Sequence, residues 1–509
     1  MPEDTTASRL RLAGLCFLLQ IFTIILFAVF VRYSPESSPA CPRPLQTHPS
    51  ASALPGFRDV HLQVLLGFGL LVAFLGRYRP GSMAISILIV AFAIQWAVLI
   101  QGFLYFFLNG KIYVGAESMV SADFCTAAVL ISTGAVLGRV NPVQMLLLTL
   151  LGVTLFSINE YILLGLMEVS RDSGGSLTVH TFGAYFGLMV SRILHQPHMG
   201  KRKEPQDTGH QADVFSVVGT IYLWIFWPSF TSATTVRNDA EPWAVLNTYF
   251  SLAASTLATF VLLPVLYEES TLQMVQIQDA TLAGVAVMGM AGEMLVTPFG
   301  ALVAGFLAGL IPPLGFRFLT PVLRSRLKTQ DTCGVHNVHG LPGLLGTLLG
   351  TLLAALATAD AYGGRLELVF PLVAQGSQTA TTQALCQLCA LPVTLLLASL
   401  GGCLTGAVLN IKGLRSPPDT SYPENTVLRE GFMGRRQQLG LDASPAAETS
   451  LLQQRLWWDT APSKPPASPD LPRAGPISAL LHLSALVQAA EEGCDRRASR
   501  KEPSTSTLV

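Results

Sequence analysis

The sequence predicts an all-α polytopic membrane protein with twelve transmembrane helices. Half of its 509 residues are hydrophobic and only 13% are charged, a balance that a soluble domain of this size does not need. The apolar residues come in runs of about twenty, the length at which a helix crosses a bilayer. These runs predict the lipid bilayer as a partner. The formal net charge is zero, so the composition gives no basis for nucleic-acid binding.

The twelve apolar runs define a transmembrane region over residues 12–411. The first run, residues 13–31, is longer than the core of a signal peptide and has no clear small-residue cleavage site, so we interpret it as a helix. A loop over residues 32–59 separates it from the second run. The expected spans are 12–31, 60–78, 83–107, 118–138, 143–167, 176–195, 213–234, 244–266, 275–292, 297–319, 333–358 and 381–411.

The distribution of basic residues predicts that both chain ends are cytoplasmic. With the N-terminus inside, fifteen Lys and Arg residues fall in inner segments near the spans and seven fall in outer loops, as the positive-inside rule requires. Residues 1–11 and 412–509 are then cytoplasmic, and the loop 32–59 is extracellular. The tail is rich in Pro, Ser and charge, and it cannot bury enough apolar surface to fold alone, so we expect it to be mostly disordered.

Ionisable residues inside the apolar runs are the candidates for function, because polar groups are expensive inside a bilayer. A hydrogen bond between helices, or a helix cap, is the structural alternative to a role in transport. An H-x-x-H pair also suggests a metal site, but zinc needs further ligands and none follows at helical spacing. We therefore predict no metal and no cofactor. The residues are Asp123, Glu160, His180, Asp279, Glu293, His336 and His339, with Asp172 just outside the sixth span.

Two of these histidines occupy corresponding places in a five-plus-five inverted repeat. His180 begins "HTFGAYFG" and His339 begins "HGLPGLLG", so each has a glycine seven residues later. They lie in corresponding spans of two five-span halves, and halves with an odd number of spans have opposite orientations, which predicts a functional site at the midplane between them. His336 also has a glycine seven residues later, so this spacing alone does not distinguish it from His339. A weaker echo places Asp123 and Asp279 before runs of small residues.

Several long motifs resemble the Rh glycoproteins, the animal branch of the ammonium transporter family. They are "DTCGVHNVHGLPG", "GGSLTVHTFGAYFG", "ADFC", "GTIYLWIFWPSF" and "LNTYFSLAAST". The likeness extends over about residues 10–420 and is greatest to the non-erythroid type B and type C members. It implies the ammonium transporter fold, assembled as a plasma-membrane homotrimer with one pore in each protomer.

The resemblance also implies roles for individual residues. His180 and His339 match the twin histidines that line the pore, and Phe124 and Phe230 match a stacked phenylalanine gate on its outer side. Ammonium would lose its proton near this gate, and ammonia would pass along the histidines. Carbon dioxide is a proposed second substrate of the family. A channel of this kind is not an enzyme.

Two carboxylates match residues that recruit ammonium at the outer vestibule, namely Asp172 and Glu160. The chain has one more residue between them than the family pattern. Asp279 stands where the family pattern has asparagine, and a carboxylate near the pore can change charge selectivity. The residues expected to support the pore lining are His336, Asp123, Asp279 and Trp227.

Two other classes of protein remain open at this point. One is a non-conducting trimeric membrane scaffold that anchors a cytoskeletal partner through its cytoplasmic tail. The intact pair of histidines and both gate phenylalanines argue against it. The other is an intramembrane metalloenzyme, which requires a bound metal.

Overall fold

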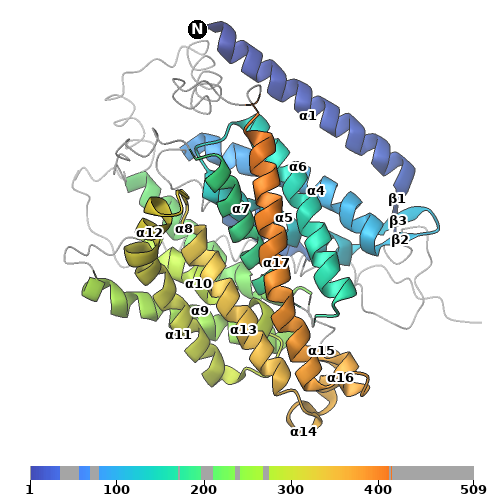
Figure 1. The fold of residues 1–509 in the computed structure, drawn as a ribbon, viewed down its shortest axis with the longest axis vertical. Coiled ribbons are helices and arrows are strands. Elements are labelled where there is room, and N and C mark those ends of the chain that lie inside the picture. Colours follow the sequence, from blue (N-terminus) through green and yellow to red (C-terminus); the bar gives the residue numbers. More distant parts are fainter. Residues whose placement is uncertain are drawn as a thin grey trace, which may run out of the picture. The chain divides into compact units, whose positions relative to one another are not determined.

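The computed structural model describes residues 2–34, 57–68, 79–169, 172–195, 210–234, 241–266, 274–411 and 414. Helices form most of this part of the chain (Figure 1). The longer α-helices are α1 (Pro2–Phe30), α4 (Arg79–Tyr105), α5 (Ala116–Val136), α6 (Pro142–Glu160), α7 (Phe182–Ile193), α8 (His210–Ser232), α9 (Glu241–Leu266), α10 (Met274–Ala291), α11 (Thr297–Leu314), α13 (Leu341–Ala355) and α17 (Ala380–Leu409).

Shorter elements connect or extend these helices. A helix over residues 57–68 contains the π-helical stretch η2 (Gln63–Gly67). The other π-helical stretches are η3 (Tyr161–Leu166), η4 (Ser176–Thr181), η6 (Gly315–Leu319) and η7 (His336–Gly340). The remaining short helices are α12 (Thr320–Ser325), α14 (Ala359–Tyr362), the 3-10 helix η8 (Gly363–Arg365), α15 (Leu366–Val369) and α16 (Pro371–Ala374).

Eight helices among the described residues are long and apolar enough to cross a membrane. They correspond to eight of the expected spans, and they are Leu10–Phe30, Ala84–Tyr105, Ala116–Val136, Pro142–Leu166, Pro242–Leu266, Thr297–Ser325, His336–Ala355 and Ala380–Leu409. Three further expected spans, 176–195, 213–234 and 275–292, are helical but outside this set. The span 60–78 is described only to residue 68, so a total of twelve stays a prediction.

The beginning of α6 illustrates how the sequence sets a helix boundary. Asn141 accepts a hydrogen bond from the backbone N–H of Gln144 at 2.8 Å, and the Gln144 side chain accepts one from the Asn141 N–H at 2.9 Å. This reciprocal pair is a capping box, and Pro142 occupies the first helical position, where its missing N–H costs nothing.

The all-α prediction missed a small three-stranded sheet. Strand β3 (Lys111–Val114) pairs in parallel with β1 (Val31–Tyr33) and antiparallel with β2 (Phe107–Leu108). The turn between β2 and β3 is Asn109-Gly110, and both residues have positive φ, as a tight hairpin turn requires. The Asn-Gly signal was present in the sequence, but strands of this length carry too few residues for an alternating pattern.

The long helices pack as two groups with matching contacts. In the first group α4 contacts α5 and α6, and α5 contacts α7; in the second, α9 contacts α10 and α11, and α10 contacts α13. The last helix, α17, packs against α6 and α7 of one group and α13 of the other (Figure 1). Helix α1 contacts α4 and α6 from outside. The element that joins the groups most directly is η4, which contacts η7, α10 and α13.

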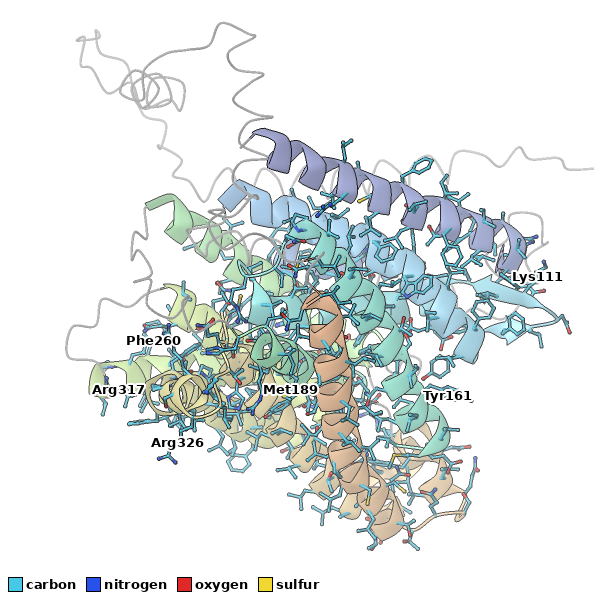
Figure 2. All side chains as sticks on the ribbon, turned by 45° about the horizontal axis from the view of Figure 1, so that its top comes forward. Lys111, Tyr161, Met189, Phe260, Arg317 and Arg326 are labelled. Atoms are coloured by element: carbon cyan, nitrogen blue, oxygen red, sulfur yellow. The ribbon has the colours of Figure 1, made fainter. Side chains whose placement is uncertain are left out.

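Charged residues expected on opposite sides of the membrane lie apart. In Figure 2, Arg317 and Arg326, expected on the inner side, lie at the left of the view, whereas Lys111, expected on the outer side, lies at the right. The outer loop between residues 35 and 56 and the tail beyond 414 fall outside the described residues. The predicted disorder of the tail therefore stays a prediction.

Candidate functional site

An aspartate caps the helix that carries His180. Asp172 Oδ2 accepts hydrogen bonds from the backbone N–H groups of Leu177 and Thr178 at 2.9 and 2.7 Å, and from Thr178 Oγ1 at 2.9 Å. Gly175 lies between the aspartate and η4 with φ of +74°, a conformation that strains other residues. Burial raises the pKa of Asp172, and the hydrogen bonds from Thr178 and Leu177 lower it.

The helix that carries His339 begins in the same way. Asp331 accepts hydrogen bonds from the backbone N–H groups of Val335 and His336, both at 2.9 Å. Gly334 has φ of +68°, and it lies three residues after its aspartate, as Gly175 does. Each histidine follows its capping aspartate by eight residues. The two helix starts are therefore built on one pattern, and each places a histidine at the end of a π-helical turn.

The two helix starts approach each other closely. A Cβ added to Gly343 of α13 would lie 2.6 Å from the carbonyl oxygen of Ser176, so only glycine fits there without displacement. Ser176 Oγ also donates to the carbonyl of Ala286 at 2.6 Å and accepts from the N–H of Met290 at 2.8 Å. Small residues that permit close backbone approach, joined by side-chain hydrogen bonds, are typical of packing between membrane helices.

This approach brings His180 and His339 into direct contact. Their Nδ1 atoms lie 3.0 Å apart, within the expected range for a hydrogen bond. The two ring planes are nearly parallel, with an interplanar angle of 11°. Both side chains are buried, at 0% and 5% exposure. His180 Nε2 has no hydrogen-bond partner among the described residues. The pair therefore offers a buried ring nitrogen to a small polar molecule.

The two gate phenylalanines are stacked. The ring centroids of Phe124 and Phe230 lie 4.3 Å apart with an interplanar angle of 21°, and both rings are buried. Trp227 connects them to the histidines, with its ring 4.7 Å from Phe230 and 6.0 Å from His180. Rings stacked at this separation leave no room for a molecule between them.

Two residues near the gate were not predicted from the sequence. His61 Nδ1 lies 3.1 Å from Asp123 Oδ1, and Asp123 immediately precedes Phe124. Ser229 Oγ donates to Asp59 Oδ2 at 3.1 Å, and Ser229 is next to the other gate residue. The helix over residues 57–68 thus contacts α5 and α8, which carry Phe124 and Phe230, through these two side chains. The triplet "DVH" at residues 59–61 was the available signal, but Asp59 fell in the expected outer loop.

The vestibule carboxylates are less exposed than a role at an open surface suggests. Glu160 is 8% exposed, and its Oε2 accepts a hydrogen bond from Gln101 Nε2 at 2.8 Å. Asp172 is 7% exposed and engaged in capping through Oδ2, although its Oδ1 has no partner among the described residues. Recruitment of ammonium by these groups stays a prediction.

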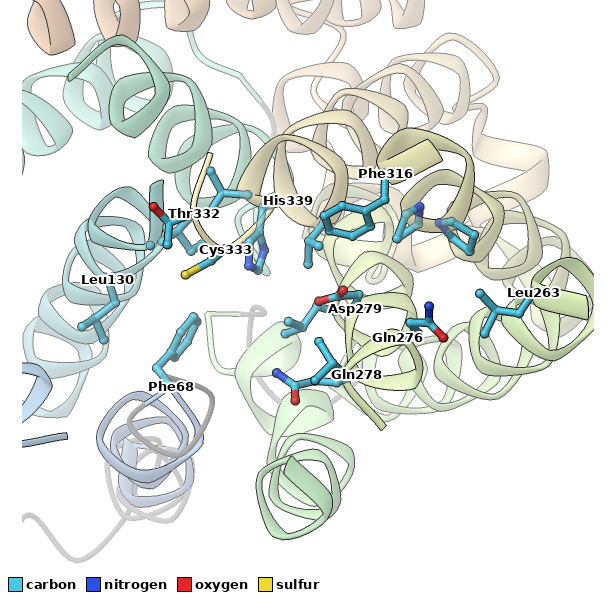
Figure 3. Close-up of a pocket in the computed structure, with 18 residues that line it drawn as sticks. Phe68, Leu130, Leu263, Gln276, Gln278, Asp279, Phe316, Thr332, Cys333 and His339 are labelled. Carbon is cyan, nitrogen blue, oxygen red and sulfur yellow. The ribbon is translucent and has the colours of Figure 1, made fainter. Parts of the chain in front are cut away.

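The first histidine of the H-x-x-H pair, His336, has different neighbours from His339. His336 is half-buried, and its Nδ1 lies 3.1 Å from Asn337 Oδ1. Its ring stands edge-on to Tyr185, at 6.0 Å between ring centroids. His339, by contrast, also lines a cavity of about 300 Å³ together with Asp279 (Figure 3). Among the described residues no group of three or more His, Cys, Asp or Glu side chains is arranged to hold a metal ion.

Comparison with known sequences identifies a family. The model of the Ammonium Transporter Family matches residues 23–420. The Ammonium transporter Rh type B of Bos taurus is 53% identical over 434 residues, which cover 84% of this chain and 95% of the relative. The Ammonium transporter Rh type B of Homo sapiens is 52% identical over 431 residues, which cover 84% and 94%.

Solved structures show the same fold. The structure described as "Nitrosomonas europaea Rh50 and mechanism of conduction by Rhesus protein family of channels" matches with a TM-score of 0.59 and 31% identity, over 77% of this chain and 98% of that one. A structure described as "Sensor Amt Protein" matches with a TM-score of 0.57 over 73% and 95%, and at 18% identity it supports the fold alone.

Proposed function

The chain belongs to the Ammonium Transporter Family, and from this premise we propose that it conducts ammonia through a pore in each protomer. The observation that carries the proposal is the buried contact between His180 and His339, which lies next to the stacked Phe124 and Phe230. The Rh50 relative at 31% identity, whose described subject is conduction, supports the same activity. The relatives are transporters and channels, which are not enzymes.

The physics of the bilayer favours ammonia over ammonium as the form that crosses. Placing a cation at the centre of a bilayer costs from about 3 to more than about 10 kcal/mol, depending on how water and protein adapt. Removing the proton of ammonium near neutral pH costs only about 3 kcal/mol, from roughly two pH units at 1.36 kcal/mol each. Neutral ammonia then passes an apolar pore at little cost.

The proposed route begins outside the gate. Ammonium gathers near Asp172 and Glu160 and is attracted by the faces of Phe124 and Phe230. There it transfers its proton to water of the outer vestibule, and the resulting ammonia passes when a gate ring rotates. Ammonia then reaches His180 Nε2, which has no hydrogen-bond partner among the described residues. A neutral imidazole can donate a hydrogen bond to ammonia or accept one from it. Trp227 supports the gate, and it contacts both Phe230 and His180.

We propose the architecture of the family for the whole assembly. Twelve spans form two five-helix halves of opposite orientation, and the homotrimer lies in the plasma membrane with both chain ends in the cytoplasm. The matching contacts within the groups α4–α7 and α8–α13 support the halves. So do the matching helix starts at Asp172 and Asp331.

The scaffold alternative explains less. A scaffold does not need a buried ring nitrogen without a partner beside two stacked aromatic rings. Its cytoskeletal partner would bind the tail, which lies outside the described residues. Carbon dioxide conduction stays a prediction, because no described residue of the proposed pore favours carbon dioxide over ammonia.

Stopped-flow measurement of ammonia flux in proteoliposomes, with simultaneous current recording, tests the proposal. Conduction requires that vesicles containing the protein change internal pH faster than empty vesicles after an ammonium jump. Equal rates would instead support the scaffold. Current that accompanies the flux would show that the proton also crosses.

A further inference from the structure

Two aspartates at matching places in the two groups of helices have different surroundings. Asp123 lies in α5 and Asp279 in α10, each before a run of small residues. The carboxylate of Asp123 has a partner, because His61 Nδ1 lies 3.1 Å from its Oδ1. No described residue donates a hydrogen bond to the carboxylate of Asp279, which instead lines the cavity beside His339 (Figure 3).

The described lining of the cavity contains oxygen atoms that can accept hydrogen bonds or bind a cation, and no basic Lys or Arg side chain. The volume of the cavity is about 300 Å³. Gln278 also lines it, is 3% exposed, and has an Oε1 without a hydrogen-bond partner in the described part of the chain. Asp279 is only partly buried, whereas an oxygen of a buried amide such as Gln278 is costly without a partner and is normally paired or bound to an ion.

The neighbouring carboxylate does not complete this site. Asp331 accepts two backbone hydrogen bonds from its own helix, so its oxygens are engaged in capping. Arg139 donates to the backbone carbonyls of Ala135 and Gln330, at 2.9 and 3.0 Å, and it does not line the cavity.

We propose that Asp279 and Gln278 bind a small monovalent cation in this cavity, beside His339. In the proposed function, on which this inference rests, the cation is ammonium. A cavity of this volume is about 8 Å across if compact, and since one water occupies about 30 Å³ of liquid, the cation can keep part of its hydration shell. Asp279 thus pairs with a cation from solution, whereas Asp123 pairs with the side chain of His61.

A cysteine in the same cavity allows a test that does not depend on transport. Cys333 lines the cavity and is half-buried. The Cys333 thiolate attacks methanethiosulfonate reagents, which forms a mixed disulfide and releases methanesulfinate. With one reagent that carries a trimethylammonium group and one that carries a sulfonate group, the ratio of the two rates reports the local potential. The full-length protein in nanodiscs is labelled with each, and mass spectrometry follows the peptide that contains Cys333.

The isosteric variant Asp279→Asn is compared with wild type and with Asp360→Asn, which removes the same charge at an exposed position away from the cavity. We expect Asp279→Asn to lower the ratio roughly four- to sixteenfold, taking a unit charge at an assumed separation of about 10 Å that acts on two opposite charges at an effective dielectric constant of about 40–80. Asp360→Asn leaves it unchanged. Ammonium chloride lowers the wild-type ratio more than choline chloride at equal concentration, and this difference disappears in Asp279→Asn.

Three results overturn the inference. The ratio is the same in wild type and Asp279→Asn, ammonium has no greater effect than choline, or neither reagent reaches Cys333 because the cavity excludes ions. Stopped-flow ammonia flux, measured on the same preparations, tests conduction separately. A protein without flux that keeps the charge-dependent ratio would refute conduction and retain the cation site, whereas normal flux with an unchanged ratio would do the reverse.

Discussion

Replacing His339 by Ala removes the only hydrogen bond of the His180 ring found among the described residues. That bond is 3.0 Å long between buried side chains, and His180 Nε2 already has no partner there. Losing one net hydrogen bond of about 1 kcal/mol along the path of ammonia corresponds to an approximately fivefold lower flux. The missing ring also enlarges the adjoining cavity of about 300 Å³. Water that enters there lowers the cost of a cation, so we expect a current to accompany the reduced flux.

The matched control is His336→Asn. His336 lies beside Asn337 and Tyr185, whereas His180 pairs with His339. Its replacement is therefore expected to leave ammonia flux within about twofold of wild type, below the effect of losing one net hydrogen bond. Stopped-flow pH recording and current recording on the same proteoliposomes measure both quantities. If His336→Asn loses flux while His339→Ala keeps it, the assignment of the pore lining is wrong and His336 must replace His339 in it.

The remaining predictions concern packing, the gate and assembly. Gly343→Ala places a Cβ 2.6 Å from the Ser176 carbonyl and is expected to lower the unfolding free energy by about 1–3 kcal/mol; Gly364→Ala, in open space, is the control, and equal thermal midpoints would contradict this. His61→Ala leaves the buried Asp123 carboxylate without its 3.1 Å contact, and the loosened gate should raise methylammonium flux relative to ammonia flux; an unchanged ratio would separate this contact from gating. Light scattering in mild detergent should give a trimer mass, and a monomer would count against the proposed assembly.

The sequence could predict the histidine pair because each histidine lies in a short motif of adjacent residues, and the two motifs match a family pattern. A glycine follows His180, His336 and His339 seven residues later, so the glycine marks the two helix starts and the match to the family motif selects His339. The structure places the rings of His180 and His339 together. The same local pattern contains more than was used. Asp172 precedes Gly175 and a helix, which is the arrangement of a capping residue, and the structure shows that its Oδ2 serves as a cap.

Contacts between distant segments could not be predicted in this way. His61 and Asp123 are 62 residues apart, and neither segment carries a pattern that specifies its partner. Asp59 and Ser229 are separated by 170 residues. Such pairs result from helix packing in three dimensions, which a single sequence does not specify. That no described residue donates a hydrogen bond to Asp279 is likewise a property of the packed helices.

The Nδ1-to-Nδ1 contact has a consequence for proton movement. When His180 Nδ1 carries the shared hydrogen, His180 Nε2 is a lone pair and His339 Nε2 carries a hydrogen; the other tautomeric state reverses both. A proton that enters at one outer nitrogen and leaves from the other moves the shared hydrogen across and reverses the polarity of the pair. A second proton arriving from the same side then meets an N–H group, and the pair must reset both tautomers before it can relay again. Ammonia that passes as a neutral molecule leaves the polarity unchanged, so this geometry allows repeated passage of the base and interrupts repeated passage of the proton.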